Sequence, residues 1–248
     1  MKLHAFLIKP NSIIRILWHL TAGLRLCRWN IFKLLKYVPD NVNSMTTAWN
    51  LSMSKFIKHP KTILDVGANN SQMIRLLQLF YDKNPKIYSF EPNPDLKPVG
   101  KVFNIALSNK DGKADFLKPG DSGWGRIANK SEVKNNKRNK SFIKVEMKKF
   151  ETLIKNNVFK LKDLKGPVLL KIDTEGHEYK VLQGFGNYLK KIDYILLEQE
   201  NRVENGSCDE AMRIAQLLGK HGFKNSTILY SAHHGKKAPV YSDVLFWK

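Results

Sequence analysis

Residues 62–71 read Thr-Ile-Leu-Asp-Val-Gly-Ala-Asn-Asn-Ser, and this stretch decides the fold. Its first half, as far as Val66, is apolar and β-branched and predicts a buried strand that ends at Gly67. Apolar residues then recur at helical spacing from Met73 to Phe80 and predict a helix. A strand that passes into a helix through a turn of small residues is typical of the first unit of a parallel α/β sheet.

The same alternation of strands and helices continues along the chain. Further strands are predicted at residues 87–90, 102–106, 168–172 and 194–197, and helices at 179–184 and 211–218. Residues 226–230 and 243–247 predict a closing antiparallel hairpin. Repeated strand–helix units predict a parallel sheet covered on both faces, with its ligand at the carboxyl ends of the strands.

Small or acidic residues follow each predicted strand, where such a ligand would bind. They are Asp65 with Gly67, Glu91, Ala106 with Ser108, Asp173 and Glu198. The set as a whole indicates a nucleoside-like ligand.

The first turn separates two nucleoside cofactors. A dinucleotide calls for G-x-G-x-x-G, but counting from Gly67 places Asn69 and Gln72 at the second and third glycine positions. S-adenosylmethionine has no phosphates, and its ammonium and sulfonium groups favour backbone carbonyls and a carboxylate such as Asp65. Glu91 ends the second strand at the distance expected of an acid that accepts hydrogen bonds from both ribose hydroxyls. The sequence therefore favours S-adenosylmethionine.

Several runs, in their order and spacing, resemble the FkbM family of methyltransferases. They are Asp65-Val66-Gly67-Ala68-Asn69, Phe90-Glu91-Pro92-Asn93-Pro94, Asn104-Ile105-Ala106-Leu107-Ser108, Lys171-Ile172-Asp173-Thr174-Glu175-Gly176-His177-Glu178 and Asp243-Val244-Leu245-Phe246. The resemblance covers roughly residues 60–248. The run D-x-E-G-H-E is its most specific element.

The resemblance implies a Rossmann-like, doubly wound, seven-stranded α/β sheet of order 3-2-1-4-5-7-6 with an antiparallel last strand. It also implies S-adenosylmethionine-dependent O-methylation of a hydroxyl on a sugar of a glycolipid or polysaccharide, or on a related small molecule. Ser71 stands where the family usually has glycine, and Lys149–Leu153 lacks the usual Leu-Asp. The cofactor-binding residues expected on this basis are Asp65, Gly67, Asn69, Ser71, Glu91, Asn104 and Ala106.

The predicted catalytic residues are His177, Asp173 and Glu175, at the end of the fourth strand. His177 lies near a helix N-terminus, which disfavours the imidazolium, so the ring is either the general base or a side chain that holds the turn in shape. Asp173 and Glu175 would orient His177 or bind the acceptor. A less favoured alternative is a Mg²⁺ site made by these two carboxylates with Glu198.

Two residues are expected at the acceptor. Trp124 lies in a Ser-Gly-Trp-Gly loop that either closes over a sugar ring or forms an ordinary surface turn. Glu198, after the fifth strand, would bind the acceptor.

Charge is concentrated in two segments of the chain. The 248 residues carry 42 Lys and Arg against 22 Asp and Glu, a net charge of +20. Residues 1–50 predict a basic amphipathic helical extension to a methyltransferase domain at 51–248, and residues 130–149 a basic loop. Residues 1–38 either contact an anionic membrane or pack on protein. No run is long enough to span a membrane, so we expect a cytoplasmic protein, either free or peripheral at the inner face of a membrane.

Two other functions remain open. The charge invites an RNA or nucleic-acid methyltransferase, although no nucleic-acid module is recognisable and nucleic acid is the disfavoured partner. The second alternative is a non-catalytic, membrane-associated protein that binds the cofactor.

The chain has only two cysteines, Cys27 and Cys208, which argues against a disulfide scaffold or a cysteine-rich zinc site.

Overall fold

A computed structural model describes residues 56–57, 59–78, 85–118, 125–129, 132–133, 142–200, 207–233 and 239–248. The chain divides into two compact units, Met1–His59 with Gln72–Asn84, and Pro60–Ser71 with Pro85–Lys248. Helix α5 (Gln72–Gln78) belongs to the first unit and agrees with the helix predicted there. The second unit carries both sheets, and the methyltransferase domain expected at residues 51–248 stays a prediction. The predicted extension at residues 1–50 lies outside the described residues.

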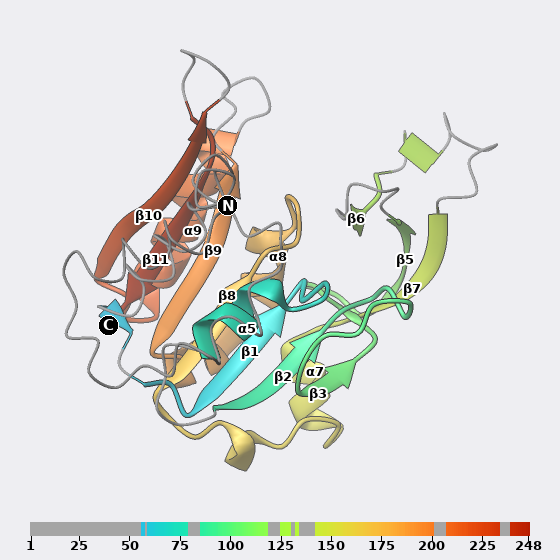
Figure 1. The fold of residues 1–248 in the computed structure, drawn as a ribbon, viewed down its shortest axis with the longest axis horizontal. Helices are drawn as coiled ribbons and strands as arrows, with labels where there is room; N and C mark the ends of the chain where they lie inside the picture. The colour runs from blue at the N-terminus through green and yellow to red at the C-terminus, as the bar shows by residue number, and fades with distance from the viewer. Residues whose placement is uncertain are drawn as a thin grey trace, which may run out of the picture. The chain divides into compact units, whose positions relative to one another are not determined.

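The main sheet has seven strands in the order β10-β11-β9-β8-β1-β2-β3 (Figure 1). Counted along the chain within this sheet and read from the β3 edge, the order is 3-2-1-4-5-7-6. Strand β11 is antiparallel to both of its neighbours, and the other neighbouring pairs are parallel. The strands are β1 (Thr62–Val66), β2 (Lys86–Phe90), β3 (Lys101–Phe103), β8 (Val168–Ile172), β9 (Tyr194–Glu200), β10 (Asn225–His233) and β11 (Pro239–Trp247).

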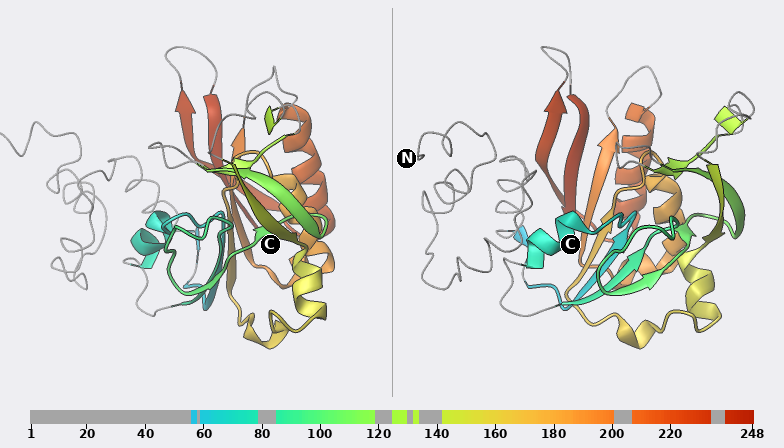
Figure 2. Two further views of the ribbon diagram at one scale, coloured as in Figure 1. Left: turned by 90° about the vertical axis from the view of Figure 1, so that its right-hand side faces the viewer. Right: turned by 45° about the vertical axis from the view of Figure 1, so that its right-hand side comes forward.

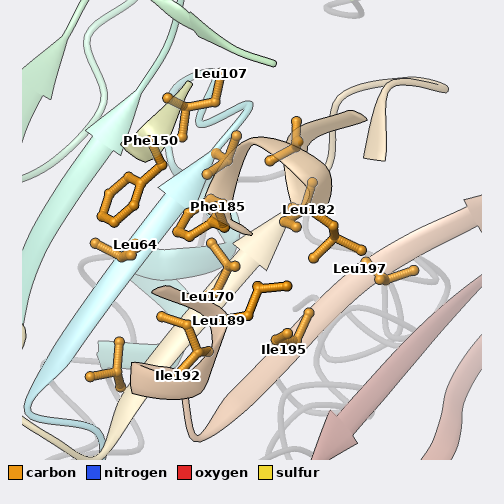
Figure 3. Packing of buried hydrophobic residues seen from close by; sticks show 14 of the residues in the cluster. Leu64, Leu107, Phe150, Leu170, Leu182, Phe185, Leu189, Ile192, Ile195 and Leu197 are labelled. Carbon is orange, nitrogen blue, oxygen red and sulfur yellow. The ribbon is translucent and has the colours of Figure 1, made fainter. Parts of the chain in front are cut away.

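Helices α7 (Phe150–Lys155), α8 (Glu178–Phe185) and α9 (Ser207–Lys220) lie on one face of this sheet (Figure 2). Phe185 and Leu182 of α8 pack against strand residues such as Leu170 and Ile195 (Figure 3). Two short 3-10 helices, Leu161–Asp163 and Gly186–Lys191, complete the connections. All five residues of β1 and of β8 are buried, which explains why both strands are mostly apolar; Asp65 and Lys171 are their buried charged residues.

A second sheet of four strands, in the order β4-β7-β5-β6, was not predicted. Its apolar side chains form a small core of their own around Phe116, Val145 and Met147. The prediction of a loop over residues 130–149 is wrong for residues 142–148, which form β7, while residues 134–140 lie outside the description. The strands are β4 (Ala106–Leu107), β5 (Gly112–Leu117), β6 (Arg126–Ile127) and β7 (Phe142–Lys148).

The boundaries of two predicted strands need correction. The third strand ends at Phe103, and Ala106 belongs instead to β4 of the second sheet. The chain crosses between the sheets at residues 104–105. Strand β9 runs to Glu200, so Glu198 lies inside the strand rather than after it, opposite Asp243 of β11. In the part of the chain that the structure describes, no helix combines the length and apolarity that a membrane span requires.

Candidate active site

The turns that follow β1 and β8 touch each other at Gly67. The backbone N–H of Asp173 donates to the carbonyl of Val66 at 3.0 Å. Gly67 has φ +69°, and a Cβ at this position would lie 1.8 Å from the carbonyl oxygen of Asp173. A side chain therefore does not fit at residue 67. Glycine at this position lets the first turn and the 173–178 turn meet at the carboxyl edge of the sheet.

Asp65 stabilises the first turn through a hydrogen bond with Ser71. Its side chain is completely buried, and its Oδ2 accepts a hydrogen bond from Ser71 Oγ at 2.8 Å. Ser71 Oγ in turn accepts from the N–H of Val99 at 3.2 Å, so the serine joins the turn to the loop after β2. Asp65 was predicted to face the positive end of the cofactor, and this stays a prediction. In the structure its carboxylate has partners within the protein, Ser71 and Lys171.

Glu91 directly follows β2 and is held by two backbone amides. Its Oε2 accepts from Asn69 N at 2.8 Å and its Oε1 from Asn93 N at 2.9 Å. Burial raises the pKa of this carboxyl above its usual range, against the opposing effect of these hydrogen bonds. A carboxylate offers about four acceptor positions, so lone pairs remain on both oxygens for the hydroxyls of a ribose.

Two further residues predicted around the cofactor lie on different parts of the fold. The side-chain amide of Asn104 donates to the backbone carbonyl of Glu91 at 3.3 Å. Ala106 is buried in β4, in the second sheet. The described residues that were predicted to bind the cofactor therefore lie in and after β1, after β2 and β3, and in β4, and their contact with S-adenosylmethionine stays a prediction.

The turn from Asp173 to Glu178 is organised by Glu178. Its Oε1 accepts from the N–H of Thr174 at 2.9 Å, from the Thr174 hydroxyl at 2.9 Å and from the N–H of Gly176 at 3.2 Å. Glu175 and Gly176 both have positive φ, so the turn bends sharply before α8 begins. The sequence analysis assigned no role to Glu178, although an acid at the first position of a helix is a usual capping signal.

Three carboxylates converge beside this turn. One oxygen each of Asp173, Glu175 and Glu198 lies within 4.8 Å of the others. Burial and then the charge of Asp173 raise the pKa of Glu175 to about 7 and that of Glu198 to about 9. Proximity of like charges therefore keeps a proton within this group near neutral pH. Oxygen ligands at these distances could hold Mg²⁺, as the less favoured prediction has it.

His177 is buried and faces the second sheet. Its Nε2 lies 3.0 Å from the hydroxyl of Ser108, which directly follows β4. Burial, with smaller contributions from Lys180 and Lys110, lowers the pKa of the imidazole to about 4, so the ring is neutral at pH 7. The prediction of a neutral histidine agrees with this geometry. The predicted acceptor residue Trp124 lies outside the described residues.

The fold is an α/β fold of the methyltransferase type, with a mixed sheet and an acidic site at the carboxyl ends of its parallel strands. The methyltransferase FkbM domain matches residues 65–224, which is more than half of the chain. The chain therefore belongs to the FkbM methyltransferase family and is an S-adenosylmethionine-dependent methyltransferase. The prediction of this family and cofactor from the sequence is confirmed.

Solved structures of other methyltransferases are similar to this chain, but distantly. Precorrin-6y C5,15-methyltransferase from Geobacter metallireducens is 12% identical over 83% of this chain and 87% of its own, with a TM-score of 0.40. The plantazolicin methyltransferase BpumL in complex with SAH is 12% identical over 88% and 89%, with a TM-score of 0.39. Human N-acetylserotonin methyltransferase in complex with SAM is 11% identical over 100% and 74%, with a TM-score of 0.33. A comparison with curated proteins found no match.

Proposed function

We propose that this methyltransferase transfers a methyl group to a hydroxyl of a sugar, in a glycolipid or polysaccharide, or of a related polyhydroxylated small molecule. The observation that carries the proposal is the convergence of Asp173, Glu175 and Glu198 at the turn that touches Gly67. Carboxylates accept hydrogen bonds from neutral hydroxyls and can take up a hydroxyl proton. A site of this kind suits an acceptor with several hydroxyl groups.

Donor and acceptor would be aligned by the two turns that meet at Gly67. Glu91 would bind the ribose hydroxyls, and the 65–71 turn would shape the pocket for the amino-acid end. Bound S-adenosylmethionine supplies the electrophilic methyl group together with its leaving group. The task left to the protein is to orient the acceptor hydroxyl and to remove its proton during attack.

Two residues are candidates for the general base. Glu175 has a pKa of about 7 and belongs to the carboxylate group, which suits proton transfer near neutral pH. The neutral ring of His177 could also accept a proton. However, its Nε2 already lies within hydrogen-bond distance of the hydroxyl of Ser108, a residue that is only 1% exposed. This geometry favours Glu175 as the base and His177 as the side chain that holds the turn. Glu198 would then bind the acceptor, and Asp173 would tune the charge of Glu175.

The acidic site argues against nucleic acid as the acceptor. A phosphodiester backbone carries negative charge, and an acidic group that keeps part of its negative charge near neutral pH offers it no favourable partner. Several lysines of the second sheet are also paired with acids, as Lys144 is with Asp115 at 2.7 Å. The net charge of +20 therefore does not identify the acceptor by itself.

The test follows a labelled methyl group from S-adenosylmethionine into two pools, a panel of saccharides and glycolipids and a preparation of total RNA. We expect label in the saccharide pool, and we expect Glu175→Gln to abolish it. Label that enters only RNA would overturn the proposed acceptor class. Cofactor binding without transfer to any acceptor would favour the non-catalytic alternative.

A further inference from the structure

Lys171 is a buried lysine that the reaction described above does not use. It lies on β8, in register with Asp65 of the neighbouring strand β1, and its side chain is only 5% exposed. A lysine is rarely buried to this extent without partners of opposite charge. Its surroundings therefore indicate what it does.

The ammonium of Lys171 has three oxygen partners, which belong to Asp65, Gly67 and Asp173. It lies 3.4 Å from Asp65 Oδ1 and 3.1 Å from Asp173 Oδ2, and it donates to the carbonyl of Gly67 at 3.1 Å. Burial opposes the charged form, but the two carboxylates outweigh it and raise the pKa of Lys171 above its usual value. The side chain is thus an internal cation between the turns after β1 and β8.

This cation occupies groups that the cofactor would otherwise be expected to use. The amino-acid end of S-adenosylmethionine carries its own ammonium, which favours a carboxylate and backbone carbonyls. Asp65 is completely buried and shared between Lys171 and Ser71. Asp173 is 34% exposed in its side chain, so it is the carboxylate of this group that can still face a ligand.

We infer that Lys171 is a positioning residue for the amino-acid end of the cofactor, because it fixes the carboxylate of Asp173 and the carbonyl of Gly67 against each other. The inference rests on the proposed function only in that the cofactor binds at this edge of the sheet. Lys171 acts through Asp173 and Gly67 and is not expected to touch the cofactor itself.

Two probes that differ only at the amino-acid end test this role. S-adenosylhomocysteine carries that end, and 5′-methylthioadenosine lacks it but keeps the adenine and ribose. For Lys171→Met, we expect calorimetry to show at least about tenfold weaker binding of S-adenosylhomocysteine, the range of a charge-assisted hydrogen bond. Binding of 5′-methylthioadenosine should change by less than about twofold. Asp173→Asn should give the same pattern.

Thr62→Val is the matched control. Thr62 is a fully buried residue at the other end of β1, where its hydroxyl donates to the carbonyl of Lys165 at 2.8 Å. The variant should lower the melting temperature and leave both affinities unchanged. If Lys171→Met does not fold, the double variant Asp65→Asn with Lys171→Met removes the charge together with its buried counter-charge, and the same selective loss is expected.

The outcomes separate this inference from the proposed function. Equal weakening of both probes, or of neither, in the Lys171 variants would overturn the positioning role. Failure of the wild-type protein to bind either probe would instead overturn cofactor binding at this edge of the sheet, and with it the proposed function.

Discussion

The hydroxyl of Ser108 and Nε2 of His177 lie 3.0 Å apart, although 69 residues separate them in the chain. Ser108 also donates its backbone N–H to the carbonyl of Lys148 at 2.9 Å, at the end of β7. Its own carbonyl packs so closely on α8 that a Cβ at Gly184 would lie 1.9 Å from it. The second sheet is thus joined through Ser108 to the turn that carries Asp173 and Glu175.

The burial of His177 predicts an acid-sensitive stability. Because its pKa is about 4 in the folded protein and 6.5 without burial, the unfolded chain binds more protons between these values. Stability should therefore fall as the pH drops from about 6.5 to about 4, by at most about 3 kcal/mol from this residue. His177→Asn keeps a partner for Ser108 and should show a shallower decline in urea unfolding. Parallel curves for the two proteins would contradict this prediction.

The pH dependence of the reaction should distinguish the two candidate bases. If Glu175 takes up the proton, kcat/KM should fall on the acid side with a midpoint near pH 7, the pKa of Glu175. Glu175→Gln should lower kcat by about 10² to 10⁴ and remove this midpoint. His177→Asn should keep it. A midpoint near pH 4 that disappears in His177→Asn would assign the base to His177 instead.

The contact between the two turns predicts that substitution of Gly67 strongly destabilises the protein. Gly67→Ala places a methyl group against the carbonyl of Asp173 at a positive φ, so it should lower the free energy of unfolding by more than about 3 kcal/mol. Gly219→Ala is the control, because nothing lies within 4 Å of a Cβ in this exposed turn of α9. It should gain about 0.5 to 1 kcal/mol from helix propensity. Equal melting temperatures for both variants would contradict the close approach.

Glu91 should affect the whole nucleoside rather than one end of it. Glu91→Ala removes the carboxylate expected to accept from the ribose, and it also frees the N–H groups of Asn69 and Asn93. We expect about ten- to hundredfold weaker binding of both S-adenosylhomocysteine and 5′-methylthioadenosine by calorimetry. This differs from Lys171→Met, which should affect only the first. Unchanged affinities would remove Glu91 from the cofactor site.

The parts of the fold that could be predicted are those with strong local signals. Strands β1 and β8 have the bounds that their apolar runs predict, because both are buried on both faces. The second sheet has a strand signal that the sequence analysis did not use, since Lys113 and Asp115 alternate with apolar residues on β5 as in a strand with one exposed face. Their partners on β7 are 29 or more residues away, at Glu146 and Lys144. A local pattern can indicate each strand, but it cannot indicate which distant strand is its partner.

The contacts in the site also divide into those that have a local sequence signal and those that do not. Asp65, Glu91 and Asp173 were predicted because strand ends are recognisable in a sequence. The turn cap by Glu178 could have been found from its position at the start of a helix. The Ser108–His177 pair and the extension of β9 past Glu198 depend on how distant segments meet, so no local pattern predicts them.

The cluster of Asp173, Glu175 and Glu198, which is proposed to serve the reaction, should make the protein less stable at alkaline pH. Burial and then the charges of Asp173 and Glu175 raise the pKa of Glu198 to about 9, so the folded protein binds a proton there that the unfolded chain releases near pH 4.5. The contribution of Glu198 to stability is therefore fully present below about pH 4.5 and is lost as the pH rises towards 9. Glu198→Gln should therefore match the wild type in acid and exceed it at pH 8. Because the side chain is partly exposed to water, we expect a gain of about 1 to 2 kcal/mol, or about 5 °C in melting temperature.

Glu146→Gln is the control for this prediction. Glu146 is also an acid within a strand, but its side chain is 51% exposed and pairs with Lys148 at 3.0 Å on the outer face of the second sheet. The substitution should change stability by less than about 0.5 kcal/mol at either pH. Methyl transfer should survive in Glu146→Gln and fall in Glu198→Gln, since the acceptor is proposed to contact Glu198. A Glu198 variant that is less stable than the wild type at pH 8 would show that the three carboxylates do not repel one another as this geometry requires.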